Sequence, residues 1–116
     1  MPLPQSFATS CHVVLITAPS ENEAHLLAKG LVENRLAACV NIVPGITSFY
    51  WWKGKVNQDA EYLLICKTTE KTWPQLRDWV VTHHSYTVPE VIALPILAGS
   101  DAYMAWLADA VPGQQL

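Results

Sequence analysis

The order of the hydrophobic segments along the chain restricts its fold more than any other feature. A β-branched run at residues 12–17 is followed at 21–34 by apolar residues at helical spacing, which predict a strand and then an amphipathic helix. Two further apolar runs, at 38–52 and 61–68, show no helical period and are separated by a turn that contains glycine. They predict a β-hairpin with a long arm.

The second half of the chain repeats the helix–strand pattern and adds a terminal helix. Pro74, which is tolerated in a first helical turn, opens the next helix. A fourth strand follows at residues 90–96, and Ser100 caps a last helix. The order β-α-β-β-α-β with a C-terminal helix predicts an α+β, ferredoxin-like sandwich, with the helices on one face of an antiparallel sheet.

The predicted hairpin is bent and carries aromatic residues near its tip. The Pro-Gly pair at 44–45 interrupts the first strand and predicts a bulge. Alternation places Tyr50 and Trp52 on one side of the arm and Phe49 and Trp51 on the other. Aromatic residues on both sides of a protruding hairpin are typical of a protein interface, for which Tyr50 and Trp52 are the predicted anchors.

Charge is scarce for a chain of this size, and this scarcity excludes several classes of partner. Only 15% of the 116 residues are charged, and the formal net charge is −3. A small monomer normally exposes more charge, so we expect part of the surface to be buried against copies of the same chain. A chain with few clustered cations is a poor ligand for nucleic acid, and it has no apolar run of the roughly 20 residues that span a bilayer.

The N-terminal sequence and the cysteines point to the cytoplasm. The first ten residues lack the basic segment and the apolar stretch of a signal peptide. The cysteines Cys11, Cys39 and Cys66 are widely spaced and form no Cys-x-x-Cys motif. We therefore expect reduced thiols and neither a disulfide framework nor a structural zinc site.

Several short motifs, spread over most of the chain in a fixed order, together resemble one family. They are LAACVNI at 36–42, PGI at 44–46, KTT at 67–69, His84, Tyr86, PEV at 89–91, LPI at 94–96, Gly99, Tyr103 and Trp106. On these motifs, residues 13–110 resemble the CutA divalent-cation tolerance family. The resemblance implies a cytoplasmic homotrimer similar to the PII signalling proteins, with three sheets packed face to face and long hairpins reaching into neighbouring copies. It also implies a role in tolerance of copper and other divalent metals.

The same resemblance implies a copper site at the end of the second helix. Some bacterial members of the family are assigned a copper site of two adjacent histidines and a cysteine of the first strand. The matching positions here are His83, His84 and Ile16. Imidazole suits copper(II), whereas an isoleucine side chain has no ligand atom. The alternative is structural: His83 packs in an apolar stripe and His84 caps the helix end, where a positive charge is favoured.

Four further residues are candidates for an additional metal or small-ligand site. Cys39 supplies either a metal-binding thiolate or a small buried hydrophobe. Lys67, Tyr86 and Glu90 lie near predicted strand ends. These three form either a cleft for a small ligand or anion, or a lysine–glutamate ion pair at a subunit interface.

The chain carries none of the Gly-x-Ser-x-Gly, Walker or His-Glu-x-x-His motifs, so we expect no enzymatic activity.

The leading prediction is a homotrimer that binds copper(II) or another divalent ion and contributes to cation tolerance. The alternative is a PII-like signalling or scaffold trimer that binds a small molecule or a protein partner in clefts between subunits. Residues 1–11 are predicted to be a flexible N-terminus, 12–112 the family domain and 113–116 a short tail.

Overall fold

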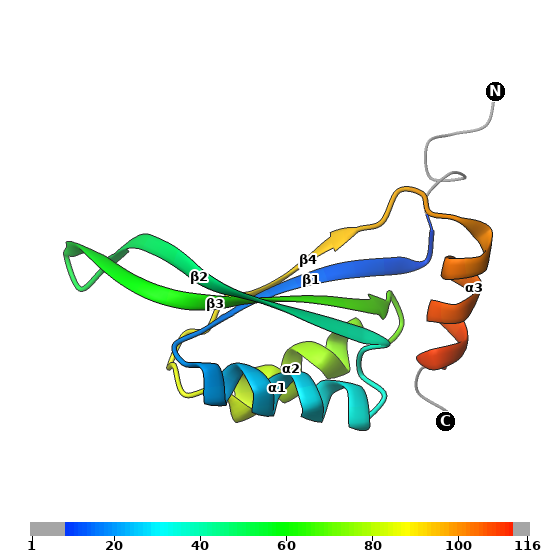
Figure 1. Ribbon diagram of the computed structural model, residues 1–116, viewed down its shortest axis with the longest axis horizontal. Coiled ribbons are helices and arrows are strands. Elements are labelled where there is room, and N and C mark those ends of the chain that lie inside the picture. The colour runs from blue at the N-terminus through cyan, green and yellow to red at the C-terminus, as the bar shows by residue number, and fades with distance from the viewer. Residues whose placement is uncertain (1–8, 113–116) are drawn as a thin grey trace.

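A four-stranded antiparallel sheet organises the structure, a computed structural model that describes residues 9–112 (Figure 1). The elements in chain order are β1 Cys11–Ala18, α1 Glu21–Glu33, β2 Cys39–Trp52, β3 Lys55–Thr69, α2 Trp73–His83, β4 Val91–Pro95 and α3 Asp101–Ala110. The strands lie in the order β2-β3-β1-β4, and each neighbouring pair is antiparallel. Because β3 lies between β1 and β2, this is the split βαβ arrangement of a ferredoxin-like fold, as predicted.

The hairpin of β2 and β3 extends well beyond the rest of the sheet as a two-stranded arm (Figure 1). The predicted bulge is confirmed, because the register shifts between Val43 and Ile46 and Gly45 adopts a φ of 73°. The arm turns through Lys53 and Gly54, both with positive φ, which is the geometry that a tight two-residue hairpin loop requires. β3 begins at Lys55, six residues before the predicted start at 61, because residues 55–60 pair with the outer part of β2.

One face of the sheet packs against α1 and α2, which lie side by side beneath it (Figure 1). α1 begins after Ser20, whose Oγ accepts a hydrogen bond from the backbone N–H of Glu23 at 3.1 Å, so the predicted N-cap is confirmed. Apart from alanines, the residues with at most 2% exposure in this core are Val14, Ile16, Leu27, Leu31, Leu64, Cys66, Leu76 and Val80. They come from alternate positions of β1 and β3 and from the inner sides of the two helices.

The opposite face of the sheet is also apolar, but α1 and α2 do not cover it. Its members share one side through the strand register, and we call them the open face: Val13, Leu15, Leu63, Ile65, Ile92 and Leu94. Ile92 is 48% exposed and Leu94 is 50% exposed. α3 lies at the end of the sheet away from the arm (Figure 1). The open face is therefore not covered by any other part of the described chain, and it is the apolar surface available to copies of the same chain.

The two ends of the described chain lie at the α3 end of the molecule (Figure 1). Thr9 is held there, because its N–H and its hydroxyl both donate to the carbonyl of Ile96, at 3.1 and 2.7 Å. Residues 1–8 of the predicted flexible N-terminus and the predicted tail at 113–116 lie outside the described residues. In the described part of the chain, none of the helices combines the length and the apolarity needed to cross a membrane.

Candidate functional site

The two adjacent histidines at the end of α2 have different surroundings. His83, the last residue of the helix, is exposed, and its ring stacks on that of Trp79 with a centroid distance of 4.1 Å. Its Nδ1 lies 2.7 Å from the carbonyl oxygen of Trp79. A carbonyl oxygen can only accept a hydrogen bond, so Nδ1 carries the hydrogen and Nε2 of the neutral ring keeps its lone pair.

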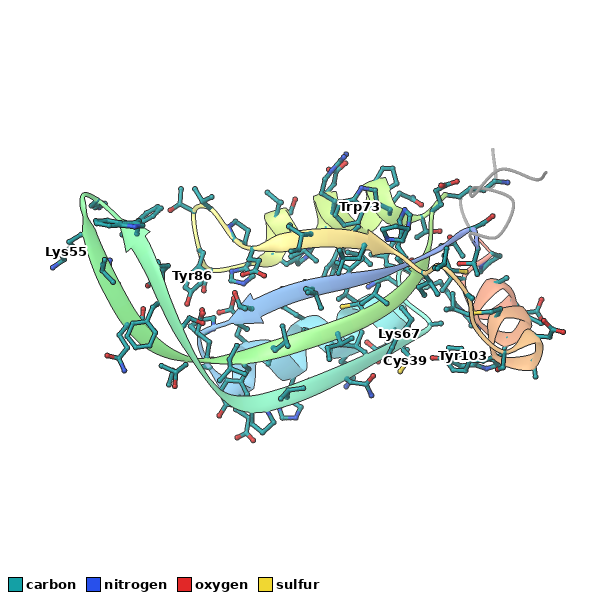
Figure 2. The ribbon with its side chains drawn as sticks, turned by 90° about the horizontal axis from the view of Figure 1, so that it is seen from above. Cys39, Lys55, Lys67, Trp73, Tyr86 and Tyr103 are labelled. Carbon is teal, nitrogen blue, oxygen red and sulfur yellow. The ribbon has the colours of Figure 1, made fainter. Side chains whose placement is uncertain are left out.

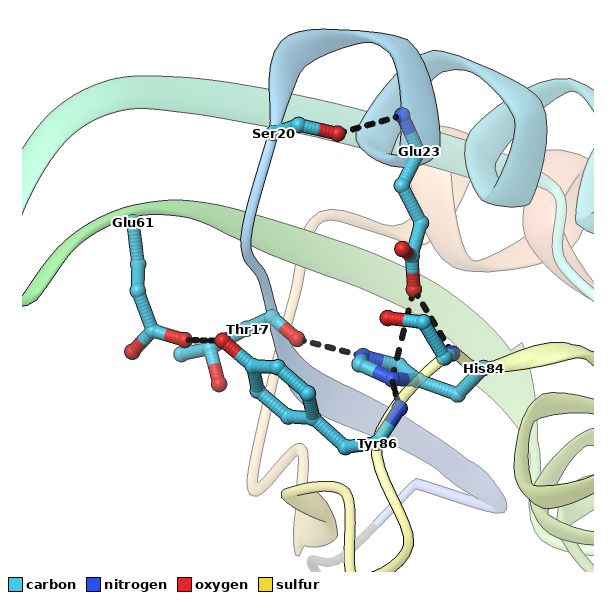
Figure 3. A network of polar contacts seen from close by, with 7 residues as sticks. Thr17, Ser20, Glu23, Glu61, His84 and Tyr86 are labelled. Atoms are coloured by element: carbon cyan, nitrogen blue, oxygen red, sulfur yellow. Dashed lines mark hydrogen bonds and ion pairs between the residues drawn. The ribbon is translucent and has the colours of Figure 1, made fainter.

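His84 is buried, and the structure engages both nitrogens of its ring (Figure 3). The backbone leaves the helix here in an extended conformation, which turns the ring toward the end of β1. Nε2 lies 2.8 Å from the Thr17 carbonyl oxygen, and Nδ1 accepts the backbone N–H of Tyr86 at 3.0 Å. Glu23 Oε2 lies 3.3 Å from Nδ1 and also accepts the N–H of Ser85. Metal coordination by His84 would require at least one of these contacts to break.

Neither Ile16, at the position of the family's cysteine ligand, nor the candidate ligand Cys39 provides a ligand atom beside the histidines. Ile16 is fully buried on the helix-covered side of β1. Cys39 stands opposite Lys67 in the register of β2 and β3, and its Sγ lies 3.9 Å from the Lys67 Nζ. Lys67 in turn pairs with Val13 of β1. His84 contacts the carbonyl of Thr17 on the same strand, and Val13 and Thr17 lie about 13 Å apart along it. Among residues 9–112, no group of three or more histidine, cysteine or acidic side chains is placed to hold a metal ion.

Tyr86 belongs to a second polar group, which contains a residue that the sequence analysis did not single out. The Tyr86 hydroxyl donates to Oε2 of Glu61 at 2.7 Å (Figure 3), and Glu61 is only 5% exposed. Burial, together with the hydrogen bond and the negative charge of Glu61, raises the pKa of Tyr86 above its usual value. Alternation along β3 places Glu61 on the same side as Leu63 and Ile65, and this acidic residue in an apolar series was the signal that could have identified it.

Tyr86 and Glu61 line a cavity of about 840 Å³ between the arm and the segment 85–90. Glu90 also lines this cavity, but Lys67 does not. Lys67 lies six residues along β3 from Glu61, about 20 Å in an extended strand, and Figure 2 shows it beside Cys39 at the opposite end of the sheet from Tyr86. The structure thus brings Tyr86 and Glu90 together and separates Lys67 from both within one chain.

The cavity lining also includes Phe49, Trp51 and the predicted interface anchors Tyr50 and Trp52. The two anchors are 39% and 44% exposed, whereas Phe49 and Trp51 on the other side of the arm are 67% and 75% exposed. The Tyr50 hydroxyl donates to a carboxylate oxygen of Asp59 on the facing strand, and this hydrogen bond is the main cause that raises the pKa of Tyr50. The alternation predicted for the arm is confirmed.

The split sheet with its long arm places the chain in a class of small ferredoxin-like proteins with solved structures. The crystal structure of CutA1 from Oryza sativa superimposes with a TM-score of 0.87 at 45% identity, covering 95% of this chain and 99% of that one. The divalent cation tolerance protein of Thermus thermophilus superimposes with a TM-score of 0.85 at 54% identity, covering 87% and 98% of the two chains.

Residues 12–110 match the family described as CutA1 divalent ion tolerance protein, and the chain belongs to this family. The relative from Thermus thermophilus, a divalent-cation tolerance protein CutA, is 57% identical over 97 residues, which are 84% of this chain and 94% of the relative. The chloroplastic protein CutA 1 of Oryza sativa is 53% identical over 95 residues. That match is 82% of this chain and 54% of the plant protein, so the chain spans about half the length of this relative.

Proposed function

We propose that this protein contributes to tolerance of divalent cations as a homotrimer that binds the ions, with copper(II) as the leading candidate. The observation that carries the proposal is the family match over residues 12–110. The relative from Thermus thermophilus bears the name of a divalent-cation tolerance protein. We propose no catalytic step, and the expected compartment is the cytoplasm, although relatives include proteins named as chloroplastic and periplasmic.

The open face supports the proposal of self-association. It presents apolar side chains from three adjacent strands, and Ile92 and Leu94 are about half exposed. An apolar sheet face of this kind in a chain of net charge −3 would favour aggregation if it stayed in water. A closed ring of copies buries such a face and limits further growth. Tyr50 and Trp52 on the arm are proposed as further contacts between copies.

His83 is the better placed of the two proposed copper ligands. Its exposed ring donates through Nδ1 to the Trp79 carbonyl, and metal-bound histidines commonly donate their second ring nitrogen to a backbone carbonyl in this way. Nε2 of His83 is then the proposed ligand atom. His84 would join only by giving up a contact with Thr17 or Tyr86, and a neighbouring copy or water would supply the remaining ligands.

Calorimetric titration with copper(II) tests the site. We expect His83→Ala to weaken binding by about tenfold or more, the effect of losing one ligand bond. His25→Ala is the matched control, because His25 is also exposed on a helix and also has its Nδ1 near the carbonyl four residues earlier, at 3.0 Å. Equal affinity in the wild type and the His83 variant, or an equal loss in the His25 variant, would refute the assignment.

The cavity beside Tyr86 favours the second candidate, a PII-like signalling or scaffold trimer that binds a small molecule between subunits. Its volume of about 840 Å³ falls in the range of small-molecule sites. A thermal-shift screen separates the two candidates, because a ligand that binds the folded state raises its melting temperature. A shift with metal ions alone supports the first candidate, and a shift with organic ligands alone supports the second.

A further inference from the structure

The charges around the cavity between the arm and the segment 85–90 all have one sign. Glu61 and Glu90 are the charged residues of its lining, and neither lysine nor arginine contributes to it. Lys67, which the sequence analysis expected to join them, lies about 20 Å away along β3. Lys55 at the tip of the arm is also six residues from Glu61 and lies outside the lining. A cavity with this lining favours a cation and disfavours an anion, which was one of the alternatives left open by the sequence analysis.

Glu61 is the residue that most needs a positive partner. It is 5% exposed, and the Tyr86 hydroxyl holds its Oε2 at 2.7 Å. Within residues 9–112, no lysine, arginine or histidine forms an ion pair with it. A buried carboxylate without a counter-charge loses hydration that one neutral hydrogen bond restores only in part. A cation that enters the cavity from outside the chain would supply the missing charge.

Aromatic rings continue the lining from this carboxylate toward the tip of the arm. The register pairs Ile46 with Glu61 and Tyr50 with Asn57, so Tyr50 and Trp52 point to the same side of the arm as Glu61. The faces of such rings attract ammonium groups and pack against the carbon atoms next to them. The cavity therefore offers a carboxylate for the charge and rings for an apolar body.

We propose that this cavity binds a small aliphatic amine, with an ammonium group at Glu61 and the carbon chain against the ring of Tyr50. A second ammonium of a diamine would reach Glu90. A metal ion fits less well, because the described residues provide no group of three acidic, histidine or cysteine ligands, and Oε2 of Glu61 already accepts from Tyr86. The inference gives a chemical class to the small-molecule candidate and uses none of the residues of the proposed copper site.

The same ammonium chemistry has two sources, a free amine or a lysine of a neighbouring copy, because Tyr50 and Trp52 are also proposed contacts between subunits. We commit to the free amine. Calorimetric titration of the full chain with diaminobutane at low salt separates the sources, because a lysine already seated in the cavity would leave no site for the diamine. We expect saturable binding with one diamine per chain.

Two pairs of variants locate the bound diamine. Glu61→Gln keeps the shape and the acceptor for Tyr86 but removes the charge, and we expect affinity to fall about tenfold or more, as for loss of a charge-assisted hydrogen bond. Glu70→Gln is the control, because it makes the same change of charge at an exposed carboxylate outside the lining. This variant should bind the diamine with the affinity of the wild type. Tyr50→Leu should weaken binding more than Trp52→Leu, because Trp52 pairs with Lys55 at the tip of the arm, about 20 Å along the strand from Glu61.

Three results would overturn the proposal. The first is no saturable binding of diaminobutane by the wild type up to about 10 mM, the weak end of specific affinity. The second is an equal loss of affinity in the Glu61 and Glu70 variants, which would indicate general charge attraction only. The third is displacement of the diamine by copper(II) with the same dependence on Glu61, which would make the cavity a metal site. His83→Ala should leave diamine binding unchanged, so this proposal and the copper assignment fail independently.

Discussion

The two faces of the sheet have similar side chains but different surroundings. On β3, Leu64 is fully buried against the helices. Ile65, the next residue, lies on the open face and is only partly buried. The same contrast separates Val14 from Leu15 on β1. Burial of one face follows from the single chain, whereas burial of the other requires a second molecule. The comparison shows which apolar residues stabilise the fold and which are available for assembly.

The largest effect is expected from the helix-covered face. Leu64→Ala removes a side chain with no exposure, and we expect it to lower the free energy of unfolding by about 2–5 kcal/mol because a cavity remains in the core. Urea denaturation measures the change. Ile65→Ala on the adjacent position of the open face should cost less in the dissociated chain. Equal losses in the two variants would remove the distinction between the faces.

The next effect concerns assembly. Leu94→Glu places a charge on the part of the open face formed by the edge strand β4, and we expect sedimentation velocity to show single chains with an unchanged circular dichroism spectrum. Val81→Glu is the matched control, because Val81 on α2 and Leu94 are each 50% exposed but Val81 faces away from the sheet. Assembly through the open face is refuted if both variants keep the mass of the wild-type assembly, or if both dissociate to single chains.

The two adjacent histidines at the end of α2 also differ in burial, since His84 is buried and His83 is exposed. We expect His84→Ala to destabilise the fold by about 1–3 kcal/mol, because the Tyr86 N–H and the Thr17 carbonyl lose their partner. His83→Ala removes an exposed ring and should change the free energy of unfolding by no more than about 0.5 kcal/mol. Thermal and urea unfolding measure both, and a larger loss for His83 would reverse the assignment of roles.

A separate effect is a dependence on alkaline pH. Burial raises the pKa of Cys66 from 9.0 to about 12. The folded state therefore favours the neutral thiol, so its contribution to stability is fully present below pH 9 and is lost as pH rises toward 12. We expect the free energy of unfolding to fall over this range, and to fall less in Cys66→Ala. Identical slopes for the wild type and the variant would show that Cys66 does not carry the dependence.

The fold was largely predictable because its signals are local. The Ser20 cap, the alternation of strand residues and the Pro-Gly bulge each depend on a few neighbouring residues, and each is confirmed. The early start of β3 was missed because residues 55–60 are mostly polar and pair only with β2 within the exposed arm. Hydrophobic pattern does not mark a strand that has no core to face.

The candidate site was less predictable because it depends on the path of the backbone. Nothing in the residue types of His83 and His84 says that the chain becomes extended at the second one and buries it. Lys67 and Tyr86 were grouped by their positions near strand ends, but strand length separates them. Glu61 could have been recognised, because it is an acidic residue in the apolar series that faces away from the helices.

The mass of the wild-type protein in solution tests the central claim most directly, namely that copies of the chain cover the open face. Sedimentation equilibrium at micromolar concentration should give three times the chain mass of 12.9 kDa. A mass of 12.9 kDa at every concentration up to the solubility limit would contradict the claim, since the open face would then remain in water.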